Sequence, residues 1–187
     1  MGCSKQLLLL DDKPVIRHCL DNIFAAGIGD VVAVLSGKNE ELIKTVKEQP
    51  VKITFNENPS SEMVDSVRIG LQAIDSSSSA VLICLSDHPL ITVETFQSVF
   101  HIHELDPDKI IIPTYNGKKG HPALFPKDII RAIFSGFTLR EIMTRDKEKV
   151  RLFDVSDEGV ILDMDTMEDY REMQFKIREE LRGKRKN

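Results

Sequence analysis

The chain has 187 residues, of which 41% are hydrophobic and 29% are charged, a balance typical of one globular domain with a sizeable core. Its net charge of −5 does not favour wrapping a nucleic-acid backbone, although a small phosphorylated substrate needs only local positive charge or a metal. No apolar run reaches the ~18 residues of a membrane helix, and the cysteines lack metal-ligand spacing, which indicates a reducing compartment. We therefore expect a cytoplasmic protein, with a single domain over residues 1–187, that binds neither nucleic acid nor membrane.

Helical and strand patterns alternate along the chain. The predicted helices begin at Pro14, Asn39, Ser60 or Ser61, Thr92, Ile129, Thr138 and Thr166, and several of these residues are favourable helix caps. The predicted strands are residues 30–35, 51–55, 80–85, 110–112, 123–125, 152–155 and 160–162. This alternation predicts an α/β fold, a three-layer Rossmann-like sandwich with helices on both faces of a mostly parallel sheet.

Residues 80–85 (AVLICL) form the most apolar predicted strand, as expected of a central parallel strand that is buried on both faces. Ligands in such folds bind beyond the carboxyl ends of the strands. Asp87 follows this strand and is the leading candidate for a Mg²⁺ ligand, because Mg²⁺ needs only one or two carboxylates together with phosphate oxygens. The alternative is that Asp87 is a turn residue before Pro89.

Asp163 and Asp165 form a second acidic pair, at the end of the last predicted strand. In a strand their side chains would share one face, and two such carboxylates repel each other unless a cation or a basic group joins them. Solvation at a strand end, with Thr166 capping the next helix, is the competing interpretation.

Two further short patterns lie near predicted strand ends or the N-terminus. Gly120, His121 and Pro122 follow a polar turn, and Lys5 follows Gly2 by three residues. Glycine allows a close backbone approach to phosphate and lysine supplies a mobile charge, but each pattern alone is weak. The sequence contains no P-loop, no Gly-x-Gly-x-x-Gly run and no Gly-x-Ser-x-Gly elbow.

Taken in order, these segments resemble the MobA-like nucleotidyltransferase family, especially its molybdenum cofactor cytidylyltransferase branch. The likeness extends to about Tyr170. The matching segments are residues 1–5 (MGCSK), 7–14 (LLLLDDKP), 26–32 (AGIGDVV), 58–59 with Met63 and Ser66, 85–90 (LSDHPL), 120–122 (GHP) and 162–169 (LDMDTMED).

The resemblance implies a Rossmann-like nucleotidyltransferase fold and transfer of a nucleotide monophosphate, CMP from CTP, to a molybdopterin-type phosphate acceptor, with release of pyrophosphate. It implies that Gly2 and Lys5 cradle the triphosphate and that Lys5 and Asp87 are catalytic. Asp87, with Asp163 or Asp165, would hold Mg²⁺. The implied nucleotide-binding residues are completed by Asn58, Met63 and Ser66, and the implied acceptor-binding residues are Gly120, His121 and Pro122. The implied protein partner is a molybdoenzyme or its maturation factor.

Two features depart from the family pattern. Family members place a strand and an Ala-Ala-Gly-x-Ser-x-Arg stretch just before the Met-Gly at which this sequence starts. We prefer a start assigned at an internal methionine over an impaired, truncated protein, because losing a central strand would expose two ladders of backbone groups. Glu62 stands where glycine is usual, which leaves open a non-catalytic nucleotide- or cofactor-binding accessory protein. A sugar-nucleotide pyrophosphorylase is a third alternative.

Overall fold

In the computed structural model, which describes residues 4–37, 39–58 and 60–184, helices and strands alternate as the sequence predicts. The strands are β1 (Leu9–Leu10), β2 (Lys13–Pro14), β3 (Val32–Ser36), β4 (Lys52–Asn56), β5 (Ala80–Ile83), β6 (Ile110–Tyr115), β7 (Lys118–Lys119), β8 (Ala123–Pro126) and β9 (Val150–Asp154). The α-helices are α1 (Val15–Ala25), α2 (Glu40–Lys47), α3 (Met63–Ala73), α4 (Val93–Leu105), α5 (Lys127–Ile130), α6 (Leu139–Arg145) and α7 (Met167–Lys184). Short 3-10 helices are η1 (Lys5–Leu7), η2 (Arg131–Ser135), η3 (Lys147–Lys149) and η4 (Glu158–Ile161).

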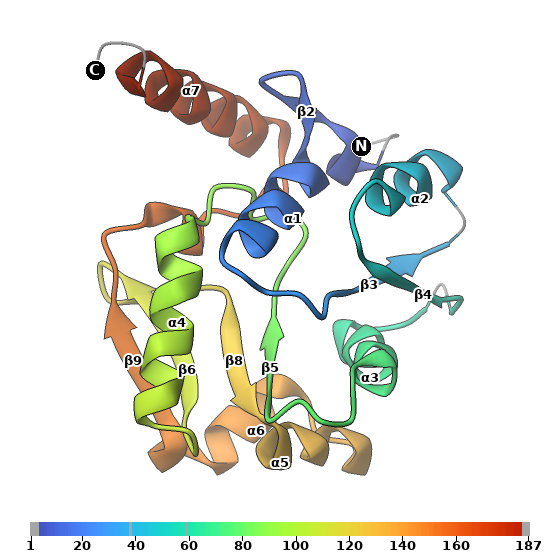
Figure 1. The fold of residues 1–187 in the computed structure, drawn as a ribbon, viewed down its shortest axis with the longest axis vertical. Helices are drawn as coiled ribbons and strands as arrows, with labels where there is room; N and C mark the ends of the chain where they lie inside the picture. Colours follow the sequence, from blue (N-terminus) through green and yellow to red (C-terminus); the bar gives the residue numbers. More distant parts are fainter. Residues whose placement is uncertain (1–3, 38, 59, 185–187) are drawn as a thin grey trace.

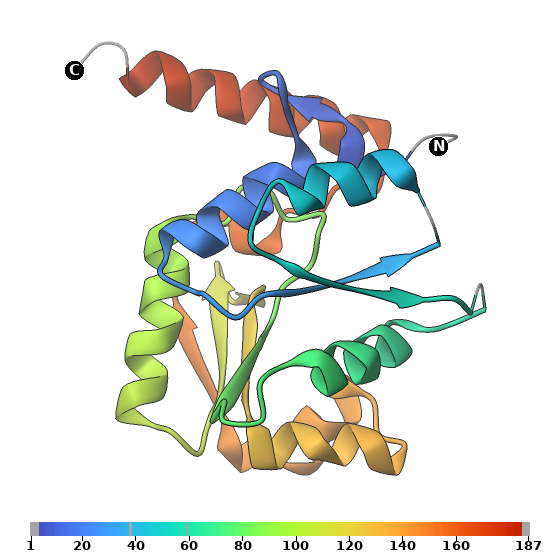
Figure 2. The same cartoon turned by 45° about the vertical axis from the view of Figure 1, so that its right-hand side comes forward.

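The main sheet has helices on both of its faces (Figures 1 and 2). Ile111 of β6 packs with Val99 of α4, whereas the alternate residues Ile110 and Ile112 pack with Ile142 of α6 on the opposite side. Successive strand residues point to opposite faces, so a strand that is apolar at every position is buried between two layers. The predicted three-layer α/β arrangement is confirmed.

The sheet is mixed, however, and the prediction of a mostly parallel sheet is wrong. Strands β3 and β4 are parallel, as are β6 and β9, but β8 runs antiparallel to both β5 and β6. Apolar composition reports burial on both faces and does not fix strand direction. The short β7 adds an antiparallel hairpin to β6.

Strand β5 lies at a sheet edge rather than in the centre. Among the described residues, β5 pairs only with β8, and β3 pairs only with β4. The strands of the described residues therefore form three sheets, namely β1–β2, β3–β4 and β5–β8–β6–β7 with β9 beside β6. Strand β5 also ends at Ile83, two residues earlier than the apolar run predicts.

The predicted strand at residues 160–162 is also wrong, because the 3-10 helix η4 covers Glu158–Ile161. A short apolar run does not distinguish a strand from a buried helical turn, and Val160 is fully buried here. Helix α3 begins at Met63, later than the predicted Ser60 or Ser61. By contrast, three predicted helix caps are confirmed, because Asn39, Thr92 and Thr138 each accept a hydrogen bond from a backbone N–H of their own helix.

The N-terminal hairpin and the last helix cover one end of the molecule together (Figure 1). The β1–β2 hairpin turns at Asp11 and Asp12, both with positive φ, a conformation that aspartate tolerates better than most residues. Tyr170 of α7 donates its hydroxyl hydrogen bond to the Leu9 carbonyl over 2.7 Å, and Leu10 is buried against Met173. This packing fixes η1 and the start of α7 beside each other. Within the described residues, no helix is both long and apolar enough to cross a membrane.

Candidate active site

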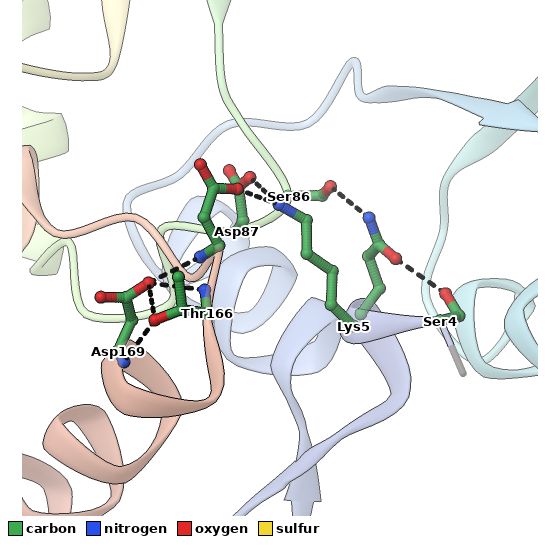
Figure 3. A network of polar contacts seen from close by, with 8 residues as sticks. Ser4, Lys5, Ser86, Asp87, Thr166 and Asp169 are labelled. Carbon is green, nitrogen blue, oxygen red and sulfur yellow. Dashed lines mark hydrogen bonds and ion pairs between the residues drawn. The ribbon is translucent and has the colours of Figure 1, made fainter. Parts of the chain in front are cut away.

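Lys5 joins two carboxylates that come from distant parts of the sequence (Figure 3). Its Nζ lies 2.7 Å from Asp87 Oδ2 and 2.8 Å from Asp165 Oδ1. The Lys5 and Asp87 side chains are 27% and 19% exposed, whereas Asp165 is 66% exposed. Two carboxylates that face one ammonium form a position prepared for positive charge.

Each of these side chains is placed by local structure. Lys5 begins η1, and Asp87 lies in a turn four residues after β5 ends. The backbone carbonyl of Asp87 accepts the Met164 N–H over 3.1 Å, which ties this turn to the segment that carries Asp165. The following helix begins with the predicted Thr166–Asp169 box, in which Asp169 Oδ2 accepts the Thr166 N–H over 2.6 Å.

The predicted pairing of Asp163 with Asp165 on one strand face is wrong, because this segment is irregular rather than a strand. Asp165 bonds Lys5, whereas Asp163 acts electrostatically on His121. The two carboxylates therefore have different neighbours, and Asp165 is the one beside Asp87.

The carboxylates beside Lys5 stabilise its charged form. Partial burial would lower the pKa of Lys5, but hydrogen bonds and attraction from Asp165 and Asp87 outweigh burial and raise it. The Lys5 ammonium is therefore held in its charged form. Hydrogen bonds from Thr166 likewise lower the pKa of Asp169.

The donor set fits a hard divalent cation. In the parts of the chain that the structure describes, there is no group of three or more His, Cys, Asp or Glu side chains arranged to hold a metal. Mg²⁺ retains several waters and requires only one or two protein carboxylates together with phosphate oxygens. Asp87 and Asp165 satisfy that requirement, since their oxygens already converge on one cationic group.

The residues that the resemblance places on the nucleotide side gather around the end of β4. Asn56, only 4% exposed, donates its side-chain N–H to Ser66 Oγ over 3.0 Å and accepts the Asn58 N–H over 3.3 Å. Met63 begins α3 and is 55% exposed. Asn56 therefore organises two of the predicted residues, although the sequence interpretation did not single it out. A polar residue that directly ends an apolar strand was the available signal.

The residues that the resemblance places on the acceptor side lie beside Asp87. Gly120 is enclosed, since a Cβ on it would lie 2.5 Å from the Val160 carbonyl oxygen, and that same carbonyl accepts the His121 N–H over 2.8 Å. Pro122 is buried. The His121 ring lies 5.2 Å, centroid to centroid, from the ring of His88, a buried residue that the sequence interpretation did not single out.

His121 is held neutral. Burial, aided by His88, lowers the pKa of His121 to about 4, while Asp87 and Asp163 oppose the shift. Its Nδ1 is buried and has no hydrogen-bond partner within the described residues. A buried nitrogen of this kind is available to a ligand, since leaving it unpaired costs free energy.

A cavity of about 820 Å³ adjoins the site. Its polar lining includes Ser4, Gln6 and Ser86 at one end and Ser66 farther along. Gln6 donates a hydrogen bond to Ser86 Oγ over 3.3 Å. Gln6 follows Lys5 in the sequence and Ser86 precedes Asp87, so this bond lies next to the Lys5–Asp87 ion pair. Gln6 and Ser86 were missed in the sequence, where nothing in their spacing connects them. Met63 also lines this cavity, whereas Asn58 does not, and Gly2 lies outside the described residues.

Comparisons with known proteins are consistent across sequence and structure. Residues 1–148 match the family described as the MobA-like NTP transferase domain. A curated relative, the bifunctional protein GlmU of Aquifex aeolicus, is 28% identical over 108 residues, which is 57% of this chain and 22% of that protein. The chain therefore spans about a fifth of the length of this relative.

Two solved structures share the fold. The manganese complex of Rv0371C from Mycobacterium tuberculosis has a TM-score of 0.76 and 22% identity, over 91% of this chain and 90% of that one. The CTP complex of CMP:2-keto-3-deoxy-manno-octonic acid synthetase has a TM-score of 0.76 and 13% identity, over 94% and 92%. Because the family match covers most of the sequence, the chain belongs to the MobA-like NTP transferase domain family.

Proposed function

We propose that this protein transfers CMP from CTP to a molybdopterin-type phosphate acceptor and releases pyrophosphate. The observation that carries the proposal is the convergence of Lys5, Asp87 and Asp165 on one position beside a large cavity. Family membership supports nucleotide transfer. The CTP-bound structural neighbour supports the choice of base, and the ordered segments from the N-terminus to Tyr170 support the acceptor.

The reaction requires mainly positioning and charge neutralisation. An oxygen of the acceptor phosphate attacks the α-phosphorus of CTP, a new P–O bond forms, and the bond to the β-phosphate breaks so that pyrophosphate leaves. Lys5 stabilises the negative charge that develops on the phosphate oxygens. Asp87, together with Asp165 or Asp163, would hold Mg²⁺, which when bound supplies further charge neutralisation. The manganese complex of a structural neighbour supports a divalent ion of this kind.

The remaining residues are assigned to the two substrates. Gly2 and Lys5 bind the triphosphate, and a nucleotide-side group binds the base and ribose. This group consists of Asn58, Met63 and Ser66. An acceptor-side group of Gly120, His121 and Pro122 binds the acceptor, where the unpaired Nδ1 of His121 offers a hydrogen bond. A molybdoenzyme or its maturation factor is the proposed recipient of the product.

The test is pyrophosphate release from each of the four nucleoside triphosphates, with molybdopterin as acceptor and Mg²⁺ or Mn²⁺ present. We expect CTP to be preferred and Asp87→Asn to lower the rate at least about a hundredfold. Asp108→Asn is the matched control, since Asp108 is exposed and lies just before β6, outside the site. Absence of pyrophosphate with every nucleotide in a folded protein would refute the proposal.

A sugar-type acceptor is the second candidate, because the CTP-bound neighbour is named for a sugar acid. Parallel assays with sugar acids and sugar phosphates separate the two acceptors.

Calorimetry tests the alternative of a non-catalytic accessory protein, which the glutamate at position 62 leaves open. Glu62 is exposed at the start of α3, where its N–H donates to Asp65 over 3.0 Å. Tight CTP binding that is unaffected by Asp87→Asn, without turnover, would support a binding protein.

A further inference from the structure

Strand β9 forms the outer edge of the main sheet, on the side away from β5. Among the described residues, β9 pairs only with β6, in a parallel register. Figure 1 shows β9 beside β6 at the left side of the sheet, next to α4. An edge strand presents a row of unpaired backbone donors and acceptors, and these groups can pair with a strand of another chain.

The backbone of β9 directs alternate residues to its free side. The Val155 N–H donates to the Thr114 carbonyl of β6 over 2.9 Å. The N–H and C=O of a strand residue point to the same side, and this side alternates along the strand. Residues 151, 153 and 155 thus face β6, whereas the backbone groups of Leu152 and Asp154 face away from it. The Leu152 side chain is 47% exposed, so this edge presents an apolar side chain as well as backbone groups.

An acidic groove of about 630 Å³ lies beside the end of β9. Residues 153–157 line one side of it and α4 lines the other. Its acidic lining residues are Glu94, Asp154 and Asp157, and none of its described lining residues is a lysine or an arginine. Asp157 Oδ2 accepts hydrogen bonds from uncharged hydroxyl groups, those of Thr92 and Thr95, over 2.9 and 2.6 Å. The groove therefore carries negative charge that no basic side chain in its described lining balances.

The segment at the start of β9 has the opposite charge. Lys147 and Lys149 are exposed in η3, on either side of Glu148, and Arg151 follows in β9, where it pairs with Asp106. The charge along residues 147–157 thus changes from basic to acidic near Leu152. In an antiparallel pair of two such segments, the basic start of each lies beside the acidic end of the other, whereas a parallel pair would bring like charges together.

We propose that two copies of this chain pair through β9, antiparallel about a two-fold axis at Leu152, and form a homodimer with one continuous sheet. This centre pairs all five residues of β9, with Val150 opposite Asp154. Leu152 exchanges backbone hydrogen bonds with Leu152 of the second copy, and the two side chains cover each other. Lys147 and Lys149 of each copy lie at the acidic groove of the other.

A second copy fits this edge better than an unrelated basic peptide, because β9 itself supplies both complementary parts. It carries an apolar residue at the centre and basic residues at the end that meets the groove. A two-fold axis uses the same surface on both chains, so one self-complementary segment is sufficient. The proposal does not depend on nucleotide transfer, because it rests on β9, α4 and η3 alone.

Disulfide cross-linking tests the register. Directly opposed residues that exchange backbone bonds have Cα atoms about 5.5 Å apart, within the range of about 4.4–6.8 Å that a disulfide spans. In a Cys3→Ser background under mild oxidation, we expect Leu152→Cys to form linked dimers at least about tenfold faster than Phe134→Cys. Phe134 is the matched control, because its side chain is 50% exposed and lies in η2, outside β9.

Charge reversal tests the contact between the two ends. One variant combines Lys147→Glu with Lys149→Glu, and the other is Glu94→Lys; each places like charges at both ends of its homodimer. We expect each to dimerise at least about tenfold more weakly in sedimentation equilibrium, whereas their mixture, with opposite charges restored at both ends, dimerises like the unmodified chain. Glu41→Lys is the control for Glu94→Lys and should change nothing, because Glu41 is likewise exposed in the first turn of a helix.

Three results would overturn the proposal. The first is an unmodified chain that remains monomeric at about 100 μM. The second is cross-linking of Leu152→Cys no faster than that of Phe134→Cys, which would mean that any dimer uses another surface or register. The third is a mixture of the two charge variants that associates no more tightly than either variant alone, which would mean that the basic and acidic ends do not meet.

Discussion

Replacing Lys5 with methionine removes the only charge that the described structure places between Asp87 and Asp165, while the side chain keeps nearly the same length. The hydrogen bond to Asp87, whose side chain is 19% exposed, should contribute about 1.5–3 kcal/mol as a charge-assisted contact. The bond to Asp165, at 66% exposure, should contribute about 1 kcal/mol or less. We therefore expect Lys5→Met to lower the free energy of unfolding by about 2 kcal/mol, or Tm by about 4–8 °C.

The informative comparison is the response to a divalent cation. In the unmodified protein the ion must displace the Lys5 ammonium from both carboxylates, whereas in Lys5→Met it meets no competitor. The affinity for Mn²⁺ should therefore rise by up to about thirtyfold, which corresponds to the ~2 kcal/mol of the lost contact. Thermal melts and calorimetry at several Mn²⁺ concentrations, without nucleotide, measure both effects.

Lys5→Arg is the matched control, because it retains the positive charge at the same position. It should keep most of the stability in the absence of metal and should not gain affinity for Mn²⁺. The account fails if Lys5→Met melts like the unmodified protein without metal and binds Mn²⁺ no more tightly. That result would mean that the ammonium does not occupy the cation position.

Three further predictions concern the surroundings of the site. Gly120→Ala should lower the free energy of unfolding by about 1–3 kcal/mol in urea titrations, because the added Cβ would lie 2.5 Å from the Val160 carbonyl oxygen. Gly29→Ala is the control and should change the free energy of unfolding little, because the space around Gly29 is open. The folded pKa of His121 is about 4 and lies below its unfolded value of ~6.5, so its contribution is present above pH ~6.5 and is lost as the pH falls to about 4. His121→Asn should remove up to about 3 kcal/mol of that pH dependence, and identical pH–stability curves would contradict the assignment. Asn56→Ala should raise the KM for CTP more than it lowers kcat, because it releases the two hydrogen bonds that organise the nucleotide-side residues; a fall in kcat alone would place Asn56 elsewhere.

Local signals in the sequence predicted the helices well. Asn39, Thr92 and Thr138 cap helices through bonds to backbone groups three residues away, so the necessary information lies within one turn. The β1–β2 hairpin was missed, although adjacent aspartates at Asp11 and Asp12 are compatible with the positive φ that its turn requires.

Tertiary features were predicted less well. The direction of β8 is decided by pairing with β5 and β6, which no local pattern reports. The run at residues 160–162 was assigned to a strand because its apolar character indicates burial without indicating which backbone conformation is buried. The separation of β3–β4 from the sheet that contains β5, β8 and β6 likewise depends on pairing between distant strands.

The candidate site depends both on local sequence signals and on contacts between segments that are distant in the sequence. Lys5 and Asp87 lie 82 positions apart in the sequence, and only the family resemblance brought them together as catalytic candidates. The strand-end position of Asp87 was a signal from the residues themselves. The resemblance also implied Asp163 or Asp165 as the second acidic residue, but no pattern in the sequence indicated which of them lies beside Lys5, and in the structure it is Asp165.

The most direct test of the cation position is a crystal structure with Mn²⁺ and a non-hydrolysable CTP analogue, in which anomalous scattering locates the metal. We expect the Mn²⁺ peak to be bonded to an Asp87 carboxylate oxygen, with the Lys5 ammonium moved from Asp87 to the triphosphate. A peak elsewhere, with Lys5 still bonded to Asp87 and Asp165, would contradict the account of this site.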